Sequence, residues 1–93
     1  MLTAIVFIKA DVARIPEIAQ QIADIEGVSE VYSVTGEIDL IALVRVRNHD
    51  IVASLVPDQL NKVPGIKSTE THIAFRTYSR HDLEAAFSLG PPE

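Results

Sequence analysis

The sequence predicts an α+β fold with the element order β-α-β-β-α-β, a ferredoxin-like two-layer sandwich followed by a short C-terminal helix. Three observations lead to this prediction: apolar residues alternate in four stretches, two stretches between them have helical periodicity, and the chain repeats itself. The repeat relates Ile25–Ser29 to Val63–Lys67, and in each copy a helix ends at glycine before a strand begins. Two βαβ halves in this order give an antiparallel sheet with both helices on one face.

The first half is expected to begin with a strand at Leu2–Lys9, where apolar residues occupy both alternating faces. Pro16 suits the first turn of a helix, because no intrahelical partner is needed there for its missing N–H. Apolar residues then recur at helical spacing from Ile15 to Ala23. Gly27 is expected to end this helix in the left-handed conformation.

The next two strands are expected at Val28–Thr35 and Ile38–Arg47, with only Gly36 and Glu37 between them. A two-residue connection with glycine first is typical of a type II′ hairpin, which needs a positive φ at that position. The third strand is apolar on one face and in the middle of the other. Asp39 therefore places a single carboxylate at the start of an otherwise apolar strand.

The second half begins at Asn48, a good N-cap for the following helix. Pro57 lies inside that helix and should kink or break it, because proline removes a backbone hydrogen bond. A fourth strand is expected at Thr71–Tyr78. The sandwich then covers residues 1–78, and residues 79–90 are expected to form the C-terminal helical tail of a single domain, 1–93.

Composition indicates that the sheet needs a partner. Hydrophobic residues make up 47% of the 93 residues and the mean hydropathy is +0.21, values that are high for a small monomer. An antiparallel sheet with helices on one face normally has a solvated second face, yet the first and third strands are apolar on both. A second copy of the chain is the simplest cover, so we expect a homodimer through this sheet face.

Charge and residue content exclude several classes of function. The net charge is −5, and no cluster of Lys or Arg is present, which argues against direct binding of nucleic acid. The absence of Cys excludes disulfides and thiolate metal sites. No apolar run approaches the roughly 20 residues of a membrane span, and no signal peptide is recognisable, so a cytoplasmic location is expected. No motif calls for a cofactor.

No catalytic constellation is recognisable in the sequence. His49, His72 and His81 are scattered over a helix start, a strand and the tail, without metal-ligand spacing. His72 could serve as a base, although an ordinary surface or interface histidine is the favoured interpretation. A dimeric ferredoxin-like-barrel enzyme of the monooxygenase or isomerase type, with His72 or Asp39 as base, is the alternative. It would require an enclosed polar pocket.

Asp39 has two interpretations. In the first, its carboxylate accepts backbone N–H groups of the hairpin or pairs with a nearby arginine, and its role is structural. In the second, the carboxylate beside Gly36 receives the ammonium group of a small zwitterion, while donors of Ser68, Thr69 and Thr71 hold the other end.

Several motifs together resemble the Lrp/AsnC effector-binding domain, also called the RAM domain. Gly36–Leu40 is similar to the G-x-x-D turn of that family and is preceded by a similar stretch, Val31–Gly36. Val63–Thr71 follows at about the family's distance, and the ending from Ala74 to Gly90 is similar to stand-alone members. The resemblance covers nearly the whole chain.

The resemblance implies a non-enzymatic sensor of amino acids that regulates transcription, forms dimers through its sheets and assembles further into rings of dimers. It also implies effector clefts between dimers, around Gly36, Asp39, Ser68, Thr69 and Thr71. The helix-turn-helix domain of full-length members is not expected here, because Met1 directly precedes the first strand. Such a module would act alone or with full-length regulators. Glu37–Ile38 departs from the family turn, which leaves the effector open. An ACT-like regulatory domain shares this element order and is a further alternative.

Overall fold

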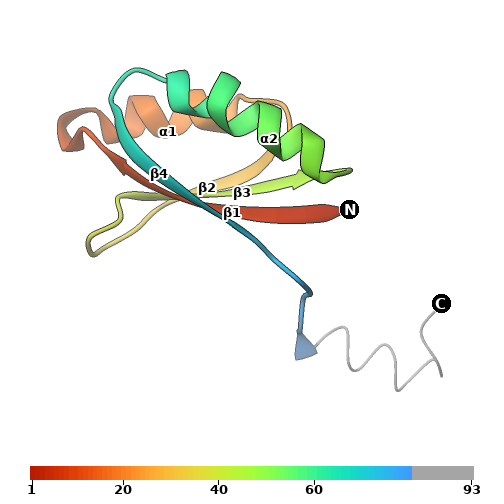
Figure 1. The fold of residues 1–93 in the computed structure, drawn as a ribbon. Coiled ribbons are helices and arrows are strands. Elements are labelled where there is room, and N and C mark those ends of the chain that lie inside the picture. Colours follow the sequence, from red (N-terminus) through yellow and green to blue (C-terminus); the bar gives the residue numbers. More distant parts are fainter. Residues whose placement is uncertain (81–93) are drawn as a thin grey trace, which may run out of the picture.

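The computed structural model describes residues 1–80, which form a four-stranded antiparallel sheet with two α-helices packed on one face (Figure 1). This confirms the predicted α+β, ferredoxin-like architecture. The predicted tail helix, residues 79–90, falls almost entirely outside the described residues. The elements in chain order are β1 (Leu2–Ala10), η1 (Val12–Arg14), α1 (Ile15–Ala23), β2 (Val28–Ser33), β3 (Leu40–Val46), α2 (His49–Asp58), η2 (Leu60–Lys62) and β4 (Ile66–Ile73).

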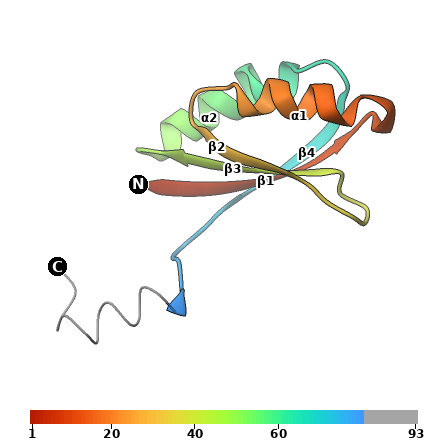
Figure 2. The ribbon, with the colours of Figure 1, turned by 180° about the vertical axis from the view of Figure 1, so that it is seen from behind.

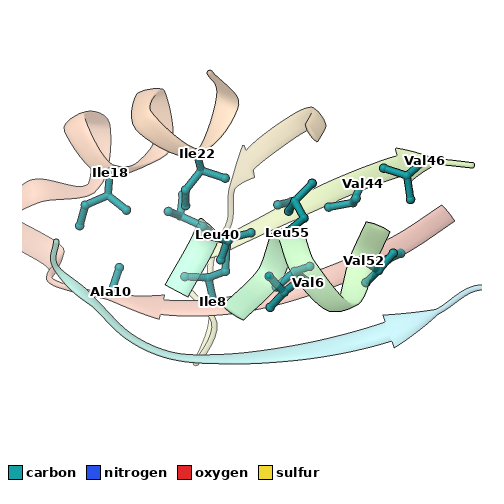
Figure 3. Close-up of a cluster of buried hydrophobic side chains, with 14 residues drawn as sticks. Val6, Ile8, Ala10, Ile18, Ile22, Leu40, Val44, Val46, Val52 and Leu55 are labelled. Atoms are coloured by element: carbon teal, nitrogen blue, oxygen red, sulfur yellow. The ribbon is translucent and has the colours of Figure 1, made fainter. Parts of the chain in front are cut away.

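The sheet is organised around β1, which lies at its centre in the strand order β2-β3-β1-β4. Ile8 pairs with Leu40 of β3 on one side and with Thr69 of β4 on the other. Alternate residues of β1 and β3 point toward the helices and are fully or almost fully buried, as their two-residue periodicity predicted. Figure 3 shows these side chains meeting the apolar faces of both helices. The buried residues are Ala4, Val6, Ile8, Ala10, Ile18, Ile22, Leu40, Ala42, Val44, Val46, Val52, Leu55, Val56 and Leu60.

The connection between β2 and β3 is longer than the predicted two-residue hairpin. The last paired residues are Ser33 and Leu40, and residues 34–39 lie between the two strands. The backbone N–H of Val34 donates to the carbonyl of Asp39, while the N–H of Asp39 donates across to β1. The hydrogen bond from Asp39 to β1 thus holds this segment as a loop that is wider than the predicted two-residue turn. The positive φ predicted for Gly36 is confirmed at +106°.

The last strand also differs from its predicted bounds of Thr71–Tyr78. It begins at Ile66 and ends at Ile73, so the Ser68–Thr71 stretch lies within the strand and not in a loop before it. The early start follows from β1, which extends to Ala10 and pairs with β4 from Ala10 to Ala4, and the pairing stops at Ile73. Beyond Ile73 a single backbone hydrogen bond, from Ala74 to Thr3, continues the ladder.

The helices largely follow prediction. Asn48 caps α2 by accepting a hydrogen bond from the backbone N–H of Ile51, at 3.1 Å. The α-helix ends one residue after Pro57 and a 3-10 turn follows, in agreement with the predicted break. Helix α1 ends at Ala23, earlier than predicted, and its C-cap is Asp24; Gly27 has the expected positive φ but precedes β2 directly. Among residues 1–80, no helix is long and apolar enough to span a membrane.

The sheet face away from the helices is not covered by any described part of the chain; we call it the open face (Figures 1 and 2). Its centre carries four half-buried apolar side chains in two neighbouring strands: Ile5 and Phe7 from β1, and Ile41 and Leu43 from β3. We call these four residues the apolar stripe. The predicted second apolar face is therefore present.

Candidate functional site

The polar end of the sheet is centred on Asp39, which precedes β3. One carboxylate oxygen of Asp39, Oδ2, accepts a hydrogen bond of 2.9 Å from the backbone N–H of Ala10. The backbone N–H of Asp39 donates to the carbonyl of Ile8, at 3.0 Å. Asp39 thus has a structural role, but the partner of its carboxylate is the backbone of β1 and not the hairpin or an arginine. Its other oxygen, Oδ1, accepts no hydrogen bond from residues 1–80.

Lys9 lies between the two β1 residues that Asp39 bonds, and its partner in the register of β4 is Ser68. Both side chains are exposed and belong to the open face, because Ile8 and Ala10 beside Lys9 point inward. Lys9 makes no ion pair within the described part of the chain. The sequence did hold a signal for it, since Lys9 is the one charged residue in the stretch Leu2–Ala10.

The two predicted threonines lie on the other side of the same strand. Thr69 is opposite Ile8 and Thr71 is opposite Val6, and both β1 residues are buried under the helices. The hydroxyl of Thr69 donates a 2.8 Å hydrogen bond to the Asn61 side chain of η2. The five predicted residues are therefore divided: Asp39 and Ser68 belong to the polar end, whereas the threonines lie on the helix side of the edge strand β4.

Gly36 forms the exposed tip of the loop that leads to Asp39. A Cβ atom added at this glycine would meet nothing within 4 Å, so the loop leaves open space around its backbone. Glycine is required there by its φ of +106° and not by close packing.

The two edges of the open face carry polar clusters. On β2, the phenol of Tyr32 donates a hydrogen bond of 2.5 Å to Glu30, and this bond raises the pKa of Tyr32; burial and the charge of Glu30 act in the same direction. Nη1 of Arg45 lies 3.7 Å from Oε1 of Glu30. On β4, His72 Nε2 lies 2.7 Å from Glu70 Oε2.

The ring of His72 packs edge-on against Phe7, with 5.1 Å between ring centroids. This histidine is half-exposed and is held by Glu70 on an open surface. The enzyme alternative needs His72 inside an enclosed polar pocket, which is a different setting.

A shallow groove of about 590 Å³ lies at the opposite end of β3 from Asp39. Its lining includes the apolar Val46 and Leu55 and the charged Arg47. None of the five predicted site residues lines it. Within residues 1–80, no group of three or more His, Asp or Glu side chains is placed to hold a metal ion.

The four-stranded sheet with two helices on one face defines a small two-layer α+β domain. The chain belongs to the Lrp/AsnC ligand binding domain family, whose family model matches residues 3–83. This agrees with the resemblance found in the sequence motifs.

Named relatives are transcriptional regulators. The uncharacterized HTH-type transcriptional regulator PH1916 of Pyrococcus horikoshii is 43% identical over 61 residues, which are 66% of this chain and 41% of that regulator. HTH-type transcriptional regulator FL11 of Pyrococcus abyssi is 29% identical over 75 residues, 81% of this chain and 49% of FL11. The chain thus spans less than half the length of these relatives.

Solved structures share the fold over most of the described residues. TTHA0845 from Thermus thermophilus superimposes with a TM-score of 0.80 at 40% identity, covering 86% of this chain and 100% of that one. E. coli AsnC superimposes with a TM-score of 0.78 at 20% identity, covering 84% of this chain and 53% of AsnC. The second likeness shows the fold alone.

Proposed function

We propose that this chain is a non-enzymatic sensing module of the Lrp/AsnC type that binds an amino acid at the polar end of its sheet. The observation that carries the proposal is the neighbourhood of Asp39, Lys9 and Ser68 on adjacent strands. A carboxylate oxygen and an ammonium group that both lack a partner within residues 1–80, on adjacent parts of the sheet, complement the two charges of a zwitterion. Membership of a ligand-binding domain family supports the same conclusion.

In the proposed site, Asp39 Oδ1 receives the α-ammonium group of the ligand, and Lys9 with Ser68 receives its carboxylate. Gly36 forms the wall, where the absence of a side chain lets the ligand approach the backbone. Thr69 and Thr71 face the helix side of the edge strand, so they would contact the ligand only in a cleft that wraps around β4. A cleft between two dimers has that form.

The open face is proposed to bind a second copy of the chain. The apolar stripe lies on a surface that no described residue covers, and stacking two stripes removes both from water. Dimers of this kind are proposed to assemble further. A ligand that contacts two dimers binds the assembled state better, and it therefore shifts the equilibrium toward that state. Such a module would regulate transcription alone or together with full-length regulators.

Isothermal titration against a panel of the common amino acids tests the site. We expect heat from at least one amino acid, with binding about tenfold weaker or more in Asp39→Asn and in Lys9→Gln. Arg47→Gln, at the opposite end of β3 from Asp39, is the matched control and should bind as the parent does. Absence of heat with every amino acid, or unchanged affinity in Asp39→Asn, would contradict the assignment.

Sedimentation velocity tests the assembly. Leu43→Asp places a charge in the apolar stripe and should produce monomers, while Val12→Asp, at an exposed apolar position on η1, should leave the dimer intact. In an ACT-like arrangement the sheets would join edge to edge, and Leu43→Asp would then leave the dimer intact as well. Repeating the measurement with an amino-acid mixture shows whether the ligand increases the assembled mass.

A further inference from the structure

The chain continues past β4 as an extended segment, residues 74–78, which we call the arm. Its first residue, Ala74, donates the last backbone hydrogen bond of the ladder, to Thr3 at 2.9 Å. After Ala74 no further backbone hydrogen bond joins the described chain to β1, and the arm leaves the sheet. Figures 1 and 2 show from opposite sides that it runs away from the helices, on the side of the open face.

The arm carries two large aromatic side chains that no described residue covers. Phe75 is 102% exposed and Tyr78 is 78% exposed, the first being the most exposed large hydrophobic residue in the described chain. Removing apolar surface from water is favourable, so a segment that exposes two aromatic rings gains by docking. With Ala74 and Arg76, these rings border a hollow of about 750 Å³.

The arm also has unused polar groups. The backbone N–H groups of residues 75–78 donate to no described residue, and an extended segment of this kind can pair with the edge of another sheet. Arg76 makes no ion pair within residues 1–80. In contrast, both edges of the open face carry an exposed glutamate, Glu30 on β2 and Glu70 on β4.

We propose that the arm is a clasp that binds a second copy of this chain stacked on the open face. Phe75 and Tyr78 pack against the edge of the partner's sheet, and Arg76 lies near one of its edge glutamates. The direction of the arm favours a second copy of the chain as its partner, because a copy stacked on the open face lies on the side toward which the arm runs. Charge agrees, since Arg76 has no ion pair within residues 1–80 and the exposed Glu30 and Glu70, paired with Arg45 and His72 along their own edges, still leave acidic side chains at the surface. By two-fold symmetry each copy gives one arm and receives one.

The inference rests on the proposed assembly through the open face, and one experiment separates the two. Dimer dissociation constants are measured by sedimentation for the parent, for Leu43→Asp, and for the double variant Phe75→Ser with Tyr78→Ser. The serines replace exposed rings, so folding should be unaffected, and circular dichroism checks this. Val12→Ser, at another exposed apolar position, is the matched control.

We expect the double variant to dissociate at about tenfold higher concentration or more, with Val12→Ser unchanged. If the parent dimerises and Leu43→Asp abolishes this, but the double variant dimerises as the parent does, the clasp is overturned while the assembly stands. A parent that stays monomeric at every concentration overturns both.

Cross-linking shows which copy the arm contacts. The chain has no cysteine, so Thr77→Cys carries a photoreactive label at a single position of the arm and keeps Phe75, Arg76 and Tyr78. Isotopically labelled and unlabelled copies are mixed, irradiated and digested. Cross-linked peptides of mixed isotope content support the clasp, whereas cross-links confined within single copies overturn it.

Discussion

The carboxylate of Asp39 accepts a hydrogen bond of 2.9 Å from the backbone N–H of Ala10, a residue 29 positions away in the sequence. This bond joins the beginning of β3 to the end of β1, the central strand. One carboxylate oxygen therefore contributes to the fold, and the other accepts no hydrogen bond from residues 1–80. Both roles that the sequence suggested for this residue can be filled by the same side chain.

The stability of Asp39 variants should separate these roles. Asp39→Ala leaves the N–H of Ala10 without a partner in a partly buried position and should lower the free energy of unfolding by about 1–3 kcal/mol. Asp39→Asn keeps a carbonyl oxygen as acceptor and should lose clearly less. Urea unfolding of the two variants measures the difference. Equal losses of stability in the two variants would mean that the hydrogen bond contributes little. If Asp39→Asn is the less destabilised variant, as expected, it is the proper variant for binding assays.

Two glycines with similar backbone conformations should respond differently to alanine. Gly36 and Gly65 both have positive φ, +106° and +99°, so alanine strains the backbone at either position by about 1–2 kcal/mol. At Gly65 the new Cβ would also lie 2.6 Å from Cδ1 of Ile18, a fully buried residue. Gly65→Ala should therefore be more destabilising than Gly36→Ala, by about a further 1–3 kcal/mol. Thermal and urea unfolding test this order, and equal losses would contradict the packing argument.

The cap of α2 gives a local prediction. The Asn48 side chain accepts from the backbone N–H of Ile51, and Asn48→Ala should lower the free energy of unfolding by about 1 kcal/mol. Asn48→Asp retains an acceptor at the same place and serves as the control. Chemical denaturation of both variants provides the measurement, and a loss as large in the aspartate variant would argue against the hydrogen bond as the cause.

The predictable parts of the fold depend on local pattern. Alternation placed Ala4, Val6 and Ile8 on one face of a strand, and helical spacing placed Ile18 and Ile22 on one face of a helix. Those patterns reflect contact with a core, and they need no knowledge of which strand lies beside which.

Strand bounds depend on neighbours, and here local pattern was insufficient. The polar stretch Ser68–Thr71 is typical of a loop, yet it forms an edge strand because β1 extends to Ala10 beside it. Phe75 and Thr77 have strand-forming side chains, yet pairing of β4 with β1 stops at Ile73 and neither residue is in the strand. The wide loop before Asp39 has the same kind of cause, a bond to a strand 29 positions away.

The candidate site was predictable only in part for the same reason. Asp39 and Gly36 are marked in the sequence by their unusual setting, a charge and a glycine between apolar stretches. The proximity of Lys9 to Ser68 follows from the register of β1 and β4, which no single stretch of sequence records.

The hydrogen bond from Tyr32 to Glu30 leads to a prediction about pH. It raises the pKa of the Tyr32 phenol, because the bond and the negative charge of Glu30 both favour the protonated form; Arg45 acts in the opposite direction. A raised pKa in the folded state means a contribution to stability that is complete below the unfolded pKa, about 10. That contribution is lost as pH rises through the higher pKa of the folded state.

Replacing the acceptor should reverse the shift. In a Tyr78→Phe background Tyr32 is the only tyrosine, since the chain has two, and its ionisation can be followed by ultraviolet absorbance. Glu30→Gln should lower the pH midpoint of that titration, because both the charge and the charge-assisted hydrogen bond are lost. Glu70→Gln changes a glutamate on the opposite edge of the open face and should leave the midpoint in place. An unchanged midpoint in Glu30→Gln would show that Glu30 does not control the phenol, and equal shifts in both variants would point to overall charge.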